Sequence, residues 1–329
     1  MKHRTEFVAT SLGRTISRIL LLLICFSFPV FAQNDEIIRI DTELVSFEVS
    51  VTDSLGNPVR GLESHNFKIF EDGTERPIDF FEPIRKQIDD RPLSIVFALD
   101  VSGSITSEEM VKLRDALRSF VKKLADYNSY FAVTTFGMKV RKIQSFTNQP
   151  NKLEKSFEKI LRDQDGLSTH AYDAADYGIR LLQKESPAAV KNKIPKRAVI
   201  LITDGFPVGD VVSPQTVIER ANESETSVYS IILPSYSRLQ AGKKPVLTLL
   251  EASGLVEKTG GRTFYATQTD FEPLFNLLAE EITSSYVLAF YPKPENRVEG
   301  KFHQVRIETS DGLQIKQNRP GYELKSNNE

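Results

Sequence analysis

Three oxygen-bearing side chains stand at alternating positions directly after an apolar run. Asp100, Ser102 and Ser104 follow residues 93–99, a mostly apolar stretch that predicts a buried strand. The carboxyl ends of strands in open α/β sheets are where ligands bind, and a glycine in the loop allows the tight turn that lets the three oxygens converge. Mg²⁺ suits such a site, because it takes oxygen ligands and usually keeps several waters.

A second apolar run, residues 198–202, ends in the same way. Thr203, Asp204 and Gly205 follow it, so a carboxylate again stands at the tip of a predicted buried strand. Asp-x-Ser-x-Ser alone arises by chance in about one chain in ten of this length, and its side chains could then serve turns and caps. Carboxylates at two strand ends favour a shared site instead.

Composition excludes several classes of function. The chain has 329 residues with 40% hydrophobic and 26% charged residues, which is ordinary for a soluble globular protein and long enough for two domains. A formal net charge of −2 argues against a nucleic-acid surface. Cys25, the single cysteine, lies in the leader, so the mature chain has no disulfide, thiolate metal site or cysteine nucleophile.

Residues 1–32 have the pattern of a secretory signal peptide. Basic residues come first, residues 19–26 are apolar, and small residues precede a cleavage point expected after Ala32. The alternative is a retained anchor helix, but the apolar run is short for a membrane span and Pro29 interrupts its end. We therefore expect an exported protein, periplasmic or extracellular, with no membrane span after signal cleavage.

The rest of the chain divides into three segments. Residues 33–91 form an N-terminal β segment that closes with a charged linker at 84–91, and residues 285–325 form a C-terminal β segment. Residues 92–284 alternate strands and helices, which predicts a Rossmann-like, doubly wound α/β fold with a mostly parallel sheet. Each β flank is too small to bury a good core alone, so we expect the two to pair as one β-sandwich of about seven strands.

Hydrophobic periodicity predicts the elements of the central segment. Strands are expected at 93–99, 131–136, 140–146, 198–202, 228–233 and 262–265. Helices are expected at 107–127, 152–162, 172–184, 214–223, 246–259 and 271–283.

A third element completes the pattern at the strand ends. Thr169 stands in a polar loop, residues 166–173, before a predicted helix. Asp-x-Ser-x-Ser, this threonine and the later Thr-Asp-Gly resemble, in kind and order, the metal-ion-dependent adhesion site motifs of the von Willebrand factor type A family. The resemblance covers about residues 93–283, and the flanks resemble bacterial secreted proteins that carry a "VWFA-related" domain.

The resemblance implies a divalent cation, Mg²⁺ with Mn²⁺ or Ca²⁺ as alternatives, and a set of five ligands. These are Asp100, Ser102, Ser104, Thr169 and Asp204. The serine hydroxyls would bind directly, the threonine directly or through water, and the carboxylates would hold coordinated waters. The open position would accept the carboxylate of an Asp or Glu from a protein partner. Family members often have Gly-Gly before the threonine; here Leu167-Ser168 stands there, which makes Ser168 an alternative ligand.

The implied function is a non-enzymatic module for adhesion or complex assembly. The alternative is a metal-assisted or Ser-dependent hydrolase that uses Ser102, His170 and Asp204 as a triad. A serine nucleophile favours a strained elbow such as Gly-x-Ser-x-Gly, which is not found around Ser102, so His170 is expected at the rim of the site. Asp173, early in its predicted helix, is assigned only to the helix dipole. A third hypothesis, a scaffold subunit with a metal-free site, is disfavoured by the complete ligand set.

Overall fold

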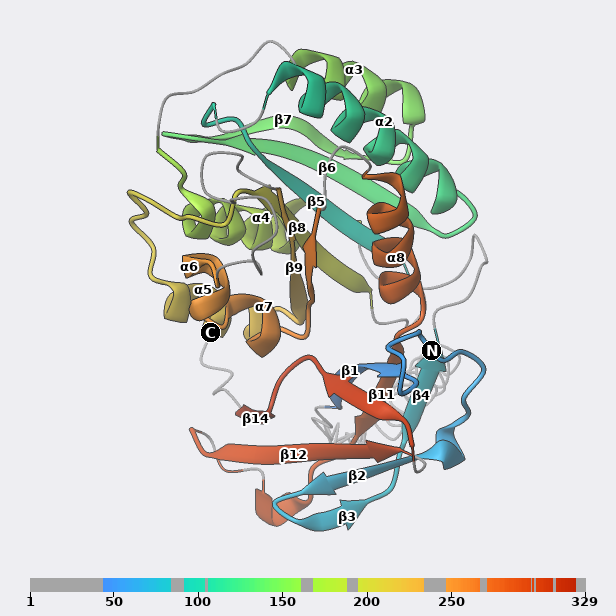
Figure 1. Cartoon of the computed structure of the whole chain (residues 1–329). Coiled ribbons are helices and arrows are strands. Elements are labelled where there is room, and N and C mark those ends of the chain that lie inside the picture. The colour runs from blue at the N-terminus through green and yellow to red at the C-terminus, as the bar shows by residue number, and fades with distance from the viewer. Residues whose placement is uncertain are drawn as a thin grey trace, which may run out of the picture. The chain divides into compact units, whose positions relative to one another are not determined.

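A computed structural model places the elements that carry these residues (Figure 1). The structure describes residues 44–83, 92–103, 106–160, 168–187, 195–233, 247–266, 271–296, 298, 300–309 and 312–323. The predicted signal peptide, the linker at 84–91 and the candidate ligand Ser104 lie outside the described residues.

A six-stranded sheet forms the centre of the α/β domain, with strand order β10-β9-β8-β5-β6-β7. Its strands are β5 (Leu93–Asp100), β6 (Ser129–Phe136), β7 (Val140–Thr147), β8 (Lys196–Thr203), β9 (Thr226–Ile232) and β10 (Thr263–Tyr265). β7 runs antiparallel to β6, and the other neighbouring strands run parallel. The predicted mostly parallel sheet is therefore confirmed.

Helices cover both faces of this sheet, so its strands are buried on both sides (Figure 1). Alternate residues of β5 enter two different cores: Phe97 stacks on Phe131 with ring centroids 5.8 Å apart, whereas Val96 packs on the opposite face. One core is covered by α2 (Ser107–Lys123), α3 (Pro150–Ile160) and α8 (Glu272–Thr283). The other is covered by α4 (Ala171–Glu185), α5 (Pro214–Glu223), α6 (Leu249–Ala252) and α7 (Leu255–Lys258).

The prediction of one helix over 246–259 is wrong. The described part of this segment holds two short helices, α6 and α7, separated at Ser253 and Gly254. Gly254 has φ 71°, a left-handed conformation that ends a helical run and that glycine adopts without steric cost. Thr248 and Glu251 form a reciprocal capping box at the start of α6, so this helix has its own beginning signal.

Two four-stranded antiparallel sheets are built from both ends of the chain. Their strand orders are β13-β1-β11-β4 and β14-β12-β2-β3. The N-terminal strands are β1 (Val45–Thr52), β2 (Phe67–Glu71), β3 (Thr74–Arg76) and β4 (Phe80–Pro83). The C-terminal strands are β11 (Tyr286–Phe290), β12 (Phe302–Thr309), β13 (Gln314–Gln317) and β14 (Gly321–Glu323). We call these eight strands the flanking β-module.

The flanking β-module has one hydrophobic core to which both sheets contribute. Val49 and Leu288 of one sheet and Ile69 and Val305 of the other are buried in it. Each sheet combines N-terminal with C-terminal strands, because β11 pairs with β1 and β4 while β12 pairs with β2. The expectation that the two flanks pair around the inserted α/β segment is confirmed.

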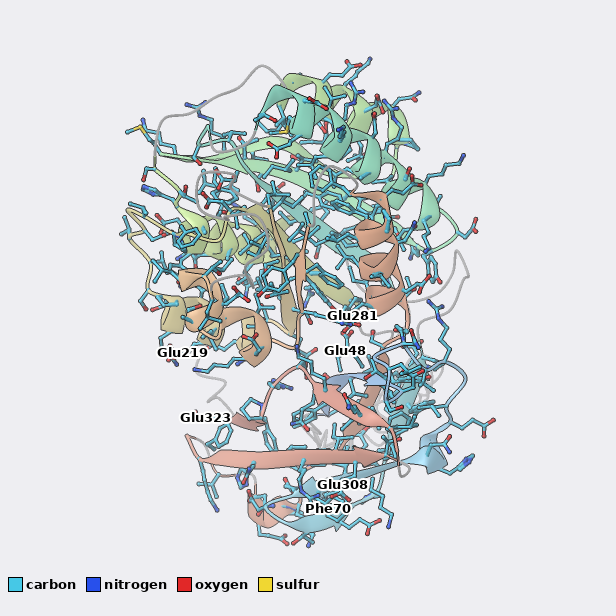
Figure 2. All side chains as sticks on the ribbon, in the orientation of Figure 1. Glu48, Phe70, Glu219, Glu281, Glu308 and Glu323 are labelled. Atoms are coloured by element: carbon cyan, nitrogen blue, oxygen red, sulfur yellow. The ribbon has the colours of Figure 1, made fainter. Side chains whose placement is uncertain are left out.

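Polar side chains connect the flanking β-module to the α/β domain. Lys196, at the start of β8 and 1% exposed, forms an ion pair with Glu48 of β1. Arg319, between β13 and β14, donates to Glu225 Oε1 at 3.3 Å and to the Asn222 carbonyl oxygen at 3.4 Å in the α/β domain. Figure 2 shows Glu48 at this junction, near the end of α8.

Among the described residues, no helix has both the length and the apolar character that a membrane crossing requires.

Candidate metal centre

Asp100 is the last residue of β5, and its side chain is completely buried. One carboxylate oxygen accepts a hydrogen bond from the Ser102 backbone N–H at 2.9 Å, and the other accepts from the Thr203 hydroxyl at 2.8 Å. β5 and β8 are parallel neighbours, so their carboxyl ends meet at the same edge of the sheet. Asp204, directly after β8, is therefore brought close to Asp100.

The electrostatics of this edge favour a cation. Burial raises the pKa of Asp100, the negative charge of Asp204 raises it further, and the hydrogen bonds from Ser102 and Thr203 act in the opposite direction. Two neighbouring carboxylates with little access to water repel one another unless a positive charge or a proton offsets them. A divalent cation near them supplies that positive charge, so the donor set fits the metal that the sequence predicts.

A second loop brings a hydroxyl to Ser102. The Thr169 hydroxyl donates to Ser102 Oγ at 3.2 Å, and both side chains are buried. The Thr169 carbonyl accepts from the Val208 N–H at 2.9 Å, and the next residue, His170, donates its N–H to the Gly137 carbonyl at 3.3 Å. The alternative ligand, Ser168, directs its hydroxyl to the Val208 carbonyl at 2.7 Å. The hydroxyl that faces Ser102 is therefore that of Thr169.

A tight turn orients Asp204. Its Oδ1 accepts from the Phe206 N–H at 3.1 Å, and the side chain is 8% exposed. Gly205 has φ 82°, and a Cβ atom there would lie 2.8 Å from Thr248 Cγ2. Only glycine combines this backbone conformation with such a close approach, so Gly205 fixes the direction in which Asp204 points.

The structure thus brings together the four predicted ligands that it describes, from the ends of β5 and β8 and from the loop before α4. Their donor atoms are two carboxylates and two hydroxyls, which are hard oxygen ligands of the kind that Mg²⁺ takes. No group of three or more His, Cys, Asp and Glu side chains that could hold a metal occurs among the described residues. A metal at this edge would therefore depend on hydroxyls and waters as well as on the two aspartates.

His170 lies at the rim, and its carboxylate partner is not the one that a triad requires. Its Nδ1 lies 3.0 Å from Asp173 Oδ2, whereas the hydrolase hypothesis assigns that role to Asp204. Asp173 also accepts hydrogen bonds from the N–H groups of Val211, at 3.1 Å, and Val212, at 2.8 Å. Asp173 therefore holds the loop after β8 in place, a role that the sequence does not reveal because Val211 and Val212 are far away along the chain.

The family that matches this chain matches it over the α/β domain. The family model of the von Willebrand factor type A domain matches residues 94–276, more than half of the chain. Over 123 residues, the chain is 30% identical to inter-alpha-trypsin inhibitor heavy chain H3 of Bos taurus. That stretch is 35% of this chain but only 13% of the relative.

Solved structures also match this chain, at low sequence identity. An aerotolerance-related membrane protein from Bacteroides fragilis is 16% identical with a TM-score of 0.43, over 58% of this chain and 98% of that chain. Proximal thread matrix protein 1 from the mussel byssus, solved with a zinc-occupied MIDAS motif, is 14% identical with a TM-score of 0.46. That match covers 62% of this chain and 49% of the mussel chain.

Proposed function

Because the chain belongs to the von Willebrand factor type A domain family, we propose that it is a protein-binding module that recognises an acidic residue of its partner through a divalent cation. The observation that carries the proposal is the 3.2 Å approach of the Thr169 and Ser102 hydroxyls beside the buried Asp100. Three separate chain segments converge on this one edge of the sheet, and all of them present oxygen.

The proposed ligand set is Asp100, Ser102, Ser104, Thr169 and Asp204. In it, the hydroxyls of Ser102 and Thr169 contact the cation, and Asp100 and Asp204 hold waters of its coordination shell. The bound cation supplies an electrophilic position that attracts an outside carboxylate, because few anionic side chains bind it directly. Asp100 also positions the loop, because its carboxylate accepts hydrogen bonds from both the Ser102 N–H and the Thr203 hydroxyl.

We further propose the organisation and location of this module. The chain comprises a signal peptide (1–32), an N-terminal β segment (33–91), a von Willebrand factor type A domain (92–284) and a C-terminal β segment (285–325). It works outside the cytoplasm, in the periplasm or beyond, in adhesion or complex assembly. It is not an enzyme. The contact of His170 Nδ1 with Asp173 supports this, because a triad of Ser102, His170 and Asp204 would need that nitrogen to face Asp204.

Isothermal titration calorimetry with Mg²⁺ and Mn²⁺ tests the proposal. The purified protein should bind either ion, and at a concentration 100 times Kd the ion should stabilise the fold by about 2.7 kcal/mol. Asp100→Ala and Thr169→Ala should lose most of the metal binding in the titration, and with it the stabilisation in an unfolding experiment.

The matched control for the metal titration is Ser168→Ala, which removes the neighbouring hydroxyl that donates to the Val208 carbonyl. This variant should keep the metal. Failure of the unmodified protein to bind either ion would refute the metal centre, and loss of binding in Ser168→Ala alone would show that the ligand assignment in this loop is wrong.

A further inference from the structure

Large apolar side chains are exposed around the candidate metal centre. Twelve such side chains occur among the described residues, and five of them lie on the loops that carry or adjoin Thr169, Asp173 and Asp204. These five, which we call the apolar rim, are Met138, Val208, Val211, Leu247 and Leu249. Exposed apolar residues scattered singly are normal, whereas several gathered on the loops around one candidate site mark an interaction surface.

Backbone hydrogen bonds place the apolar rim on two sides of Thr169. Val208 donates its N–H to the Thr169 carbonyl at 2.9 Å, so it adjoins the loop that carries the candidate ligand. On the other side, Met138 follows Gly137, whose carbonyl accepts from the His170 N–H at 3.3 Å. Thr169 therefore lies between the β6–β7 turn and the loop after β8.

The remaining rim residues are fixed beside Asp204 and Asp173. The N–H of Leu250, next to Leu249, donates to the Gly205 carbonyl at 3.2 Å, and the Leu249 carbonyl accepts from the Tyr172 hydroxyl at 3.2 Å. The Val211 N–H donates to Asp173. Met138, Val208, Val211 and Leu249 are thus connected, directly or through a neighbour, to Thr169 or to residues beside the candidate ligands. Leu247 adjoins Thr248, whose side chain lies against Gly205.

The loop after β8 holds two valines outward in an ordered conformation. Val208 is 57% and Val211 is 88% exposed, although Val212, beside them, packs against the core. The bonds to Thr169 and Asp173 use only backbone atoms of the two valines. Their side chains are free to contact a partner, and the fixed loop means that little conformational entropy is lost on binding.

We propose that the apolar rim receives apolar side chains that flank the acidic residue of the partner, so that the partner is a protein segment with one Asp or Glu among apolar residues. This inference rests on the proposed function, which provides for the acidic residue itself. A strongly acidic partner fits poorly, because Asp100, Asp204 and Asp173 already place three carboxylates at this end of the sheet. The rim offers apolar contact on two sides of Thr169 and thereby defines which residues should surround the acid.

A displayed library of random peptides, selected on the full chain in Mg²⁺ and counter-selected in chelator, tests the inference. Chelator-sensitive peptides should carry one Asp or Glu with Leu, Ile, Val, Phe or Met within two positions on either side. A selected peptide should bind the Val208→Thr, Val211→Thr double variant about tenfold more weakly. Threonine keeps the branched shape of valine and the backbone hydrogen bonds, and replaces one methyl group with a hydroxyl.

Two controls separate this inference from the proposed function. Val298→Thr changes a 51% exposed valine between β11 and β12, outside the α/β domain, and should leave peptide affinity unchanged. Calorimetric Mg²⁺ binding should be equal in the unmodified protein and in the double variant. If Mg²⁺ binds but the selected peptides have polar or charged flanks, or no chelator-sensitive peptide is enriched, the rim inference is overturned and the metal centre stands. If Mg²⁺ does not bind, the proposed function fails first.

Discussion

Replacing Lys196 by methionine tests how the flanking β-module is attached to the α/β domain. The Lys196 side chain is 2% exposed and forms an ion pair with Glu48, whose side chain is 12% exposed. The Lys196 ammonium also lies 3.4 Å from the Tyr229 hydroxyl and 5.6 Å from the centre of the Tyr229 ring. Methionine keeps most of the apolar stem of lysine, and it removes the charge together with the ammonium's contacts to Ser227 and Tyr229.

The cost of this change follows from the burial of the pair. Removing one partner of a buried ion pair costs about 3–5 kcal/mol, because the remaining charge stays in a poorly solvated place. Glu48 keeps a little exposure, so we expect about 3 kcal/mol for Lys196→Met. The matched control is Lys112→Met on α2. Its partner Glu108 is 78% exposed, so the loss of this pair should change the stability far less.

Urea unfolding of both variants measures the difference. The loss of stability in Lys196→Met should clearly exceed that in Lys112→Met when both are compared with the unmodified protein under the same conditions. If Lys196→Met lowered the free energy of unfolding by less than about 1 kcal/mol, and by no more than Lys112→Met does, the buried-pair argument would be refuted.

Two further changes probe other parts of the fold. In the flanking β-module, the hydrogen bond from His303 lowers the pKa of Asp72 below its usual 3.8. The Asp72 carboxylate therefore stabilises the fold fully above pH 3.8, and this stabilisation is lost as the pH falls further. In urea unfolding, Asp72→Asn should be less stable than the unmodified protein at pH 7, and the difference should close below pH 3.8. A Cβ atom at Gly261 would lie 1.8 Å from the Val228 carbonyl oxygen, so Gly261→Ala should cost about 3 kcal/mol or more in thermal unfolding, and a cost within 0.5 kcal/mol would contradict this packing.

The sequence predicts the central fold because its signals are local. The apolar runs of β5 and β8 have the length and composition of buried parallel strands, and the polar residues that end them follow immediately. The pairing of the flanks is predictable as well, since neither flank alone has enough apolar residues for a core.

The sequence does not predict features that depend on contacts between distant residues. Asp173 has the position of a helix-dipole residue, but its carboxylate binds the backbone of Val211 and Val212. The periodicity of residues 246–259 continues through Gly254, so the break between α6 and α7 is visible only in that glycine's left-handed backbone. The exposure of Val208 and Val211 likewise depends on the hydrogen bonds that hold their loop, which no local pattern shows.

The two ends of the inserted α/β domain leave the flanking β-module side by side. Pro83, the last residue of β4, is the register partner of Tyr286, the first residue of β11, and the two strands are antiparallel neighbours. Cα atoms of such partners lie about 5 Å apart, a span that a hairpin turn closes. A gene segment that encodes the α/β domain could therefore replace a hairpin turn in another β-protein. In this protein, a short turn could then join β4 directly to β11. Of the junction contacts described above, such a transfer would break the pair between Lys196 and Glu48 and the contacts of Arg319 with Asn222 and Glu225.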